Sequence, residues 1–426
     1  MTALYPLLQV VNPQLPPPSA LVYFIATVIK MLVIFTMYMV GVALLTLAER
    51  KISAWIQDRH GPNRVGGKLG LLQPAADGLK NIMKEETYPG EANIPVFVLA
   101  PALSFIPALL TWCVIPFASP LPTRWGLIDM VVAPLPIGYL FILAIASLGV
   151  YGIVLAGWSS NNKYALLGGL RSSAQMVSYE IAMGMSTIPV LLLAGNVALN
   201  DIVLQQAHGL WNVLGLSVAF FIFLVSAFAE TNRLPFDLPE AESELIAGYH
   251  SEYSAMKFSM FFIAEYANMV TASALMVTLF FGGWDIPGQW DVAPWTGLKT
   301  LATFLFFAAK VLFFLFFYMW IRWTLPRFRY DQLMSLGWKF MLPLALGYIV
   351  AIAAAILGLD AAHVARGSWA FGLSLLALNV VILAVLFFLV DRGRLVSPAY
   401  SRLDKRNLEK LRAQTARAAL RAEARN

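Results

Sequence analysis

Cysteine and histidine are scarce in this chain of 426 residues, which contains one cysteine and four histidines. The single thiol of Cys113 cannot form an internal disulfide, and it cannot supply the four thiolates that an iron–sulfur cluster usually needs. The histidines are scattered, without the spacing of a zinc site or a haem ligand pair (His60, His208, His250 and His363). We therefore expect no metal site and no redox centre in this chain.

Charged residues are also scarce, at 13% of the chain against 59% hydrophobic residues. This composition excludes an ordinary soluble domain, and several apolar runs reach about 20 residues, the length at which an α-helix crosses a bilayer. We expect an all-α polytopic membrane protein whose membrane domain is 1–391. The nine expected spans lie at about 21–48, 94–118, 131–157, 173–195, 211–230, 258–284, 297–323, 338–358 and 369–391.

Positive charge is concentrated on alternate connections between these spans. Lys and Arg number 7 in 49–93, 2 in 158–173, 2 in 231–257, 4 in 322–339 and 10 in 392–426, whereas the other connections hold only Arg124, Lys299 and Arg366. The positive-inside rule then places the N-terminus outside and the C-terminus in the cytoplasm. The first 20 residues contain no Lys or Arg, which argues against a cleaved signal peptide.

The C-terminal segment 392–426 is a basic cytoplasmic tail. It has 10 basic residues and only three acidic ones, and no aromatic residue follows Tyr400. We interpret it as a surface helix near anionic lipid or a partner subunit. A nucleic-acid partner is not expected, because no stacking aromatics are interleaved with the basic residues.

The first cytoplasmic loop contains a short amphipathic segment. Apolar residues recur at helical spacing between Leu72 and Met83, while Gln73, Asp77 and Lys80 fall on the opposite face. The pattern predicts an interfacial helix at about 69–86 that lies on the membrane and covers a lipid-accessible chamber beside span one. Basic residues at the end of that span, such as Arg50 and Arg59, have an alternative role as anchors to lipid headgroups.

Four ionisable residues fall within or at the end of predicted spans. Glu180 and Glu265 lie several residues inside spans four and six, Glu230 closes span five, and Lys310 lies near the middle of span seven. A charge at such a depth costs several kcal/mol unless it is paired or neutralised. One interpretation is a buried ion pair that holds helices together. A chain of titratable groups that conducts protons is the other, and it is favoured because buried ion pairs are rarely net stabilising.

The loop 231–257 is the most informative segment of the sequence because it gathers carboxylates between two apolar stretches. Its acidic residues are Asp237, Glu240, Glu242, Glu244 and Glu252. Crowded carboxylates raise one another's pKa, so such a cluster can hold and release protons near neutral pH. A solvated acidic loop is the alternative, but Leu234, Phe236 and Leu238 are apolar enough to pack against the membrane domain.

These motifs occur together and in order, and the chain resembles the H subunit, or mitochondrial subunit 1, of proton-pumping NADH:quinone oxidoreductase (complex I). Four stretches carry the resemblance: 49–63 with 70–77, Ser178-Tyr179-Glu180, 229–244, and Lys310 with 320–322 and 326–334. The resemblance implies a membrane subunit that forms part of a quinone chamber and couples quinone reduction to proton translocation. It implies an enzyme subunit that is not catalytic alone.

The resemblance also implies roles for individual residues. The residues that would bind the quinone or line its chamber are Arg50, Arg59, Asp77, Phe236 and Glu265. The acidic loop and the proton path would comprise Glu180, Glu230, Arg233, Asp237, Glu240, Glu242, Glu244 and Lys310. No cofactor would be bound by this chain, with FMN and iron–sulfur clusters held in partner subunits. The expected partners are the other complex I subunits, quinone and membrane lipid, and the expected location is a bacterial inner membrane.

Two departures and two alternatives accompany this interpretation. His60 stands where some relatives have lysine, and the ninth span and basic tail exceed the eight-span core of mitochondrial relatives.

A homologous subunit of a hydrogenase or formate-linked complex would share the core but use another electron donor. An independent proton-coupled transporter would show an inverted repeat, which the sequence does not.

Overall fold

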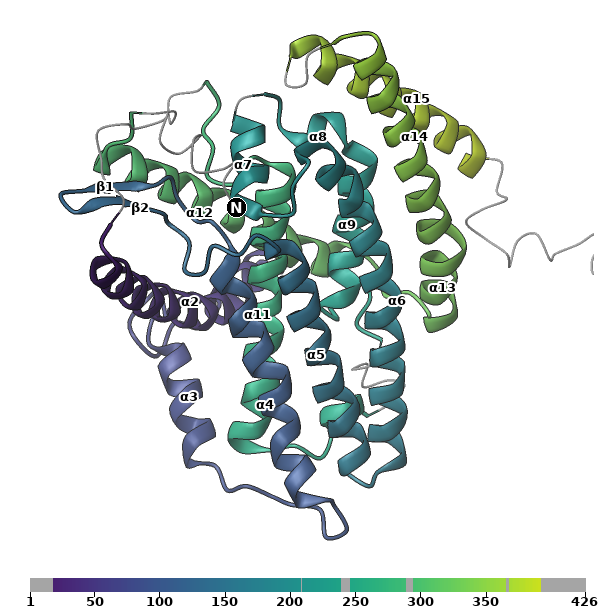
Figure 1. Ribbon diagram of the computed structural model, residues 1–426. Coiled ribbons are helices and arrows are strands. Elements are labelled where there is room, and N and C mark those ends of the chain that lie inside the picture. The colour runs from purple at the N-terminus through teal and green to yellow at the C-terminus, as the bar shows by residue number, and fades with distance from the viewer. Residues whose placement is uncertain (1–17, 208, 239–245, 289–293, 365–367, 392–426) are drawn as a thin grey trace, which may run out of the picture.

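The computed structural model describes residues 18–207, 209–238, 246–288, 294–364 and 368–391, and these are almost entirely helical (Figure 1). In the first half the elements are α2 (Ala20–Ile56), α3 (Gln73–Met83), α4 (Ile94–Leu110), η1 (Thr111–Val114), β1 (Leu121–Thr123), β2 (Gly126–Ile128), α5 (Gly138–Ser159), α6 (Lys163–Ala194) and α7 (Leu199–Ala207). The second half contains α8 (Asn212–Gly215), α9 (Ser217–Glu230), η2 (Gly248–His250), α11 (Ala255–Phe280), α12 (Gly297–Thr324), α13 (Tyr330–Leu336), η3 (Gly337–Met341), α14 (Leu342–Ala361) and α15 (Trp369–Asp391).

Eight helices of the described residues are long and apolar enough to cross a membrane. They are α2, α4 with η1, α5, α6, α11, α12, α13 with η3 and α14, and α15. The predicted class, an all-α polytopic membrane protein, is confirmed. The two strands form one small antiparallel hairpin, in which Leu121 is opposite Ile128.

The predicted span 211–230 is divided into α8 and α9. The 14 residues of α9 rise about 21 Å at ~1.5 Å per residue, less than the ~30 Å thickness of a bilayer core. Leu216 leaves the helical conformation, with φ −132° and ψ 41°. Asn379 of α15 fills the break: its Nδ2 donates to the carbonyl of Gly215, and its Oδ1 accepts the amide of Val218 at 3.4 Å. A buried carboxamide thus replaces the hydrogen bonds lost where the helix breaks.

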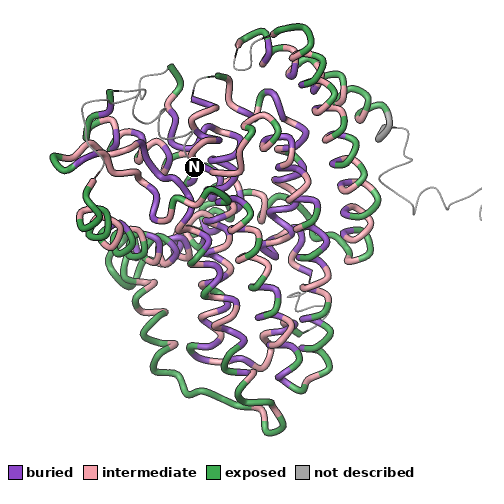
Figure 2. The backbone as a smooth tube through the Cα atoms, viewed as in Figure 1, coloured by how far each residue is buried: buried purple, intermediate pink, exposed green. Residues whose placement is uncertain are grey.

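The core lies between α4, α5, α6, α9 and α11, where the buried positions gather (Figure 2). Small residues allow these helices to approach closely. A Cβ added to Gly152 of α5 would lie 2.2 Å from Oγ of Ser104 in α4, so only glycine permits this contact. Large side chains such as Tyr179 and Phe223 then fill the space between the more widely separated helices.

The helix α3 is the amphipathic element that the sequence predicts, and it is shorter than the expected 69–86. It contains no buried residue, and its apolar side chains, such as Leu79 and Ile82, are exposed. The loop that follows α3 is tied to the start of α11, because Nζ of Lys257 lies 2.5 Å from a carboxylate oxygen of Glu86 and over the ring of Tyr88. This attachment fixes one end of α3 beside α11.

Candidate functional site

A charged cavity of about 440 Å³ lies where the C-terminal half of α2 meets α11 and α12. Its lining is Thr46, Glu49, Arg50, Ser53, Arg59, Pro62, Phe262, Tyr266, Arg322 and Trp323. Three of these residues are arginines and one is a buried carboxylate, while Phe262, Tyr266 and Trp323 supply aromatic surface. The cavity therefore suits a flat ligand with polar substituents.

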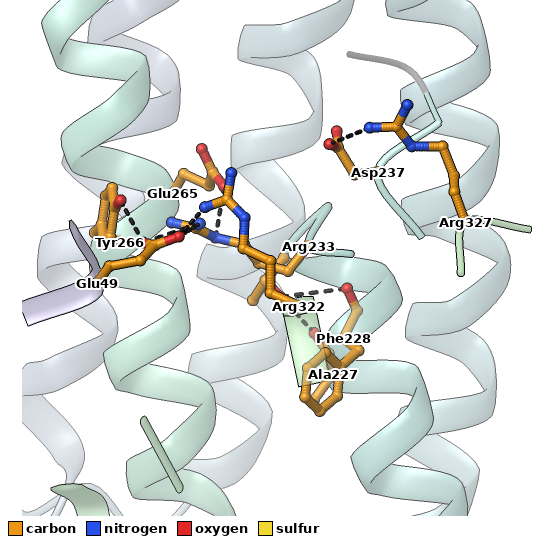
Figure 3. A network of polar contacts seen from close by, with 10 residues as sticks. Glu49, Ala227, Phe228, Arg233, Asp237, Glu265, Tyr266, Arg322 and Arg327 are labelled. Atoms are coloured by element: carbon orange, nitrogen blue, oxygen red, sulfur yellow. Dashed lines mark hydrogen bonds and ion pairs between the residues drawn. The ribbon is translucent and has the colours of Figure 1, made fainter. Parts of the chain in front are cut away.

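Glu49 is the centre of the charged network at this cavity (Figure 3). Its side chain is 6% exposed, and it accepts hydrogen bonds from Nη1 of Arg233 at 3.1 Å and from the hydroxyl of Tyr266 at 2.5 Å. Arg322 forms a further ion pair with the same carboxylate. A carboxylate with these partners can remain buried, since each charge-assisted bond offsets part of the desolvation.

Arg233 joins Glu49 to a second, half-buried carboxylate, that of Glu265. Its Nε lies 2.7 Å from Oε1 of Glu265, and its guanidinium lies over the ring of Tyr266 at 4.3 Å from the ring centre. The two carboxylates and the two guanidinium groups of Arg233 and Arg322 balance in formal charge. A change of protonation or ligand charge at Glu49 therefore acts on Glu265 through one shared arginine.

The backbone that carries Arg233 is held by polar groups of α6. Nε2 of Gln175 donates to the carbonyls of Ala229 and Phe236 at 2.8 and 2.9 Å. Nδ2 of Asn232 donates to the hydroxyl of Ser172 at 3.0 Å. The turn after α9 is therefore fixed at both of its ends, and the orientation of Arg233 follows from that turn.

Asp237 begins the acidic loop and pairs with Arg327, whose Nη2 lies 3.3 Å from Oδ2 of the aspartate. Burial raises the pKa of the Asp237 carboxyl to about 6, against the opposing charges of Arg327 and Arg233. The predicted Glu240, Glu242 and Glu244 lie outside the described residues. The Asp237 carboxyl therefore titrates closer to neutral pH than an ordinary aspartate does.

The predicted quinone-facing residues fall into two groups. Arg50 and Arg59 line the charged cavity, and Arg50 binds Asp77 of α3 with 2.6 Å between Nη1 and Oδ2. Phe236 and Glu265 are not among the residues that line this cavity. Phe236 is buried against Tyr179 and Phe328, and Glu265 reaches the site through Arg233.

An apolar cavity of about 380 Å³ runs along the same helices. Its lining is Ile34, Met37, Tyr38, Gly41, Val42, Leu44, Leu45, Ala48, Trp112, Phe117, Val270, Phe304, Phe307, Ala308, Val311, Leu312 and Leu315. On α2 this lining ends at Ala48, next to Glu49 of the charged cavity. Along α2, α11 and α12, an apolar groove is therefore followed by a charged one.

A third, much smaller cavity of about 30 Å³ has both Glu265 and Glu230 in its wall. Such a volume is large enough to hold a water molecule. Glu180 lies on α6, which packs against α9, the helix that ends at Glu230. Two of the predicted in-span carboxylates thus share one cavity, and the third lies on an adjacent helix.

Lys310, a residue of the predicted proton path, is bonded to the backbone that follows α11. Its Nζ donates to the carbonyls of Phe281, Gly283 and Asp285 at 2.7, 3.0 and 2.7 Å, beyond the C-terminal end of α11. The ring of Trp211 lies on one side of the ammonium, at 4.3 Å. Carbonyl oxygens accept hydrogen bonds, so this lysine stabilises the turn at the end of α11.

The sequence alone predicts no functional role for four residues of this site: Tyr266, Arg322, Gln175 and Ser172. Arg322 could have been noticed as a basic residue near a span end, within the motif 320–322. Nothing in the local sequence distinguishes Tyr266 or Gln175 from ordinary core residues, because their partners lie on other helices.

A family model described as NADH dehydrogenase matches residues 29–353. The chain belongs to this family. The H subunit of NADH-quinone oxidoreductase from Leptospira biflexa is 51% identical over 325 residues, which cover 74% of this chain and 90% of that protein. An H subunit of the same enzyme from Cytophaga hutchinsonii is 49% identical over 324 residues, covering 76% and 94%. NADH-ubiquinone oxidoreductase chain 1 of Chondrus crispus is 49% identical over 338 residues, covering 79% and 99%.

The family membership confirms the resemblance that the four motifs indicated. These relatives are named as oxidoreductase subunits, so a hydrogenase subunit and an independent transporter are not favoured. The family match contains the helices that form the charged cavity and ends within α14. The helix α15, which supplies Asn379, lies beyond it.

Proposed function

We propose that this chain is the membrane subunit of a proton-translocating NADH:quinone oxidoreductase, and that the charged cavity receives the quinone headgroup. The observation that carries the proposal is the succession of two cavities along the same helices, one charged and one apolar. A quinone is an amphiphile with a polar ring and an isoprenoid tail. The arrangement fits both parts, with the ring beside Arg50, Arg59 and Arg322 and the tail along the apolar groove.

Quinone reduction links this cavity to proton movement. Each quinone takes two electrons and two protons to become a quinol. The electrons come from an iron–sulfur cluster of a partner subunit, and FMN is also held in the partner subunits. Protons taken up by the quinone leave carboxylates behind, which changes the charge that Arg233 and Arg322 face. Arg233 transmits the change from Glu49 to Glu265, because it binds both.

The proton path then continues through the carboxylates that the family resemblance indicated. Glu265 and Glu230 share a water-sized cavity, and Glu180 follows Glu230 along the membrane interior. The acidic loop, with Asp237 and with Glu240, Glu242 and Glu244, supplies protons at the cytoplasmic side. Lys310 supports this path by keeping the end of α11 in place.

Phe236 and Asp77 have supporting roles in this proposal. Asp77 holds α3 to Arg50 at the mouth of the charged cavity, so α3 covers the entrance from the bilayer surface. Phe236 packs on Tyr179 and Phe328, and it thereby fixes the turn that carries Arg233. Both residues affect the quinone through the parts of the fold that they position.

The proposed location is the inner membrane of a bacterium, with the N-terminus outside and the basic tail in the cytoplasm. The charge asymmetry of the connections supports this orientation. The partners are the iron–sulfur subunit at the quinone site, other membrane subunits of the complex, and membrane lipid. The charged cavity then opens on the side of the membrane where those electron-carrying subunits bind.

The test is purification of the tagged chain in a mild detergent, followed by assay of NADH:quinone reductase activity. We expect flavin and iron–sulfur proteins in the eluate, with activity that a quinone-site inhibitor abolishes. Partners that oxidise hydrogen or formate would instead assign the chain to a related complex. A chain that purifies alone and transports protons would reject the subunit assignment.

A further inference from the structure

The small cavity between Glu265 and Glu230 has a wall that contains more polar groups than the two carboxylates. It lies between α4, α5, α9 and α11, and its volume is about 30 Å³. The polar side chains in its wall are those of Ser104, Glu230, Thr231, Asn232, Tyr249, Glu265 and Asn268. A water molecule needs two to four polar partners in a buried site, and this wall supplies them.

Asn268 differs from the other amide in this wall. Asn232 is bonded on both sides, to Ser172 and to Gln175. The carboxamide of Asn268 makes no hydrogen bond to any group in the described part of the chain. It lies three residues after Glu265 on α11, so both side chains point to the same face of the helix. Asn268 is half-buried, and its carboxamide lines the cavity, so it is available to bind a water molecule there.

Gly149 of α5 keeps the cavity open. It is buried and lines the cavity, and a Cβ added there would meet no heavy atom within 4 Å. An alanine therefore fits at this position without a clash and reduces the volume left for water. Ser104, on the facing helix α4, reaches only the carbonyl of Gly149, at a long 3.4 Å, so its hydroxyl remains available to a water.

We propose that Asn268 is a positioning residue that holds water between the carboxyl groups of Glu265 and Glu230, in a space that Gly149 leaves open. This rests on the proton-translocating function proposed above. The protonated Glu265 carboxyl gives its proton to the water, and the same water gives another proton to the Glu230 carboxylate. The net result is a charged Glu265, now paired with Arg233, and a neutral Glu230, with the water regenerated.

The first test compares Asn268→Thr with Asn268→Val in the intact complex. Threonine and valine have nearly the same shape, but only threonine has a hydroxyl that can bind water in place of the carboxamide. We expect Asn268→Thr to retain proton pumping and Asn268→Val to lower it roughly ten-fold, which corresponds to about 1.4 kcal/mol in the transfer step. The ratio of protons pumped to electrons transferred and the pH profile are measured, because a purely structural defect would lower reductase activity in both variants alike.

The second test fills the cavity without removing any polar group. Gly149→Ala should lower the proton-to-electron ratio, whereas Gly347→Ala should not. Gly347 is the matched control, since it lies in α14, is exposed, and also has no heavy atom within 4 Å of an added Cβ. Alanine is also favoured over glycine in a helix, so neither change should weaken folding.

The outcomes separate this inference from the function on which it rests. Wild-type complex without inhibitor-sensitive quinone reductase activity would overturn the proposed function, and the inference with it. Full activity in the wild type together with unchanged pumping in Asn268→Val and Gly149→Ala would overturn the inference alone. Loss of pumping in those two variants, with retention in Asn268→Thr and Gly347→Ala, supports it.

Discussion

Arg233 and Glu49 are 184 residues apart in the sequence, and they meet as a buried ion pair with 3.1 Å between Nη1 and Oε1. The same guanidinium binds Glu265, so one arginine is shared by the carboxylate of the charged cavity and the carboxylate that leads deeper into the membrane domain. In the proposed function, this relationship connects the charged cavity to the proton path through a single side chain. It also makes Arg233 the residue whose loss should have the largest effect.

Replacement of Arg233 by leucine should strongly destabilise the membrane domain. It leaves the buried Glu49 and the half-buried Glu265 with one fewer partner each, and removal of one member of a buried pair typically costs about 3–5 kcal/mol. The measurement is the amount of chain in the purified complex and its thermal midpoint. Arg233→Lys is the control, because it keeps the charge but loses the geometry that binds two carboxylates at once. A leucine variant with the wild-type midpoint would contradict the shared-arginine network.

Asp237 should give the stability of the complex a pH dependence near pH 6. Burial raises the pKa of its carboxyl to about 6 from an ordinary value of 3.8. Between these two pH values the folded chain binds a proton that the unfolded chain does not, so this contribution to stability is present at low pH and is lost as the pH rises through 6. Thermal midpoints measured from pH 5 to 8 should therefore show a component that disappears in Asp237→Asn.

The control for Asp237 is Asp58→Asn, which removes an exposed carboxylate from the loop after α2. It should leave the pH dependence of the wild type unchanged. If both variants retain the component near pH 6, the titrating group is another residue of the site. Measurement of quinone reductase activity over the same range shows whether the proton on Asp237 also affects catalysis.

Glu242→Gln should lower coupled quinone reduction without loss of assembly. This prediction follows from the sequence alone, since Glu242 lies outside the described residues. Glutamine keeps the size of the side chain but cannot carry a proton or a charge, and roughly ten-fold slower turnover is expected if the carboxyl takes part in proton transfer. Glu85→Gln, in an exposed position, is the matched control. Full activity of Glu242→Gln would reject the acidic loop as an active element.

Asn379→Leu should destabilise the chain by about 1–3 kcal/mol for each polar group left without a partner. The carboxamide bonds the backbone on both sides of the break between α8 and α9, and its Oδ1 also accepts the hydroxyl of Tyr348 at 2.8 Å. The measurement is the thermal midpoint of the purified complex. Ser374→Ala serves as the control, because Ser374 bonds only the carbonyl of Phe371 in its own helix. Equal thermal midpoints for both variants would mean that the break between α8 and α9 is stable without the carboxamide of Asn379.

The helices and the in-span carboxylates could be predicted from the sequence because their signals are local. A run of apolar residues identifies a span wherever it lies, and an ionisable residue such as Glu180 or Glu265 stands out within it. The division of the span 211–230 could not be predicted in this way. The residue that makes it possible, Asn379, is more than 160 positions away and looks like an ordinary polar residue in an apolar helix.

The pairings within the site could be predicted only in part. The resemblance implies roles for Arg233 and Glu265 near one chamber, but the sequence does not show that a single guanidinium joins Glu265 to Glu49. It also assigns Lys310 to the proton path, whereas its three backbone acceptors depend on how the chain turns after α11. Such contacts depend on tertiary packing, which periodicity and spacing do not encode.

Gly41→Leu should distinguish the isoprenoid tail from the quinone ring as the occupant of the apolar groove. Gly41 lines that groove on α2, and an added Cβ meets no heavy atom within 4 Å, so a leucine enters the groove without displacing a neighbour. We expect KM to rise several-fold for a long-tailed quinone and to stay unchanged for an analogue with a short tail, because only the long tail extends along α2. Each buried methylene of the tail contributes about 0.8 kcal/mol to binding, so displacement of even one or two methylenes is measurable.

Gly347→Leu in α14 is the control, since Gly347 is also exposed and unobstructed but lies away from the groove. An equal effect of Gly41→Leu on both substrates would place the obstruction at the ring, and no effect on either would exclude this groove as the path of the tail.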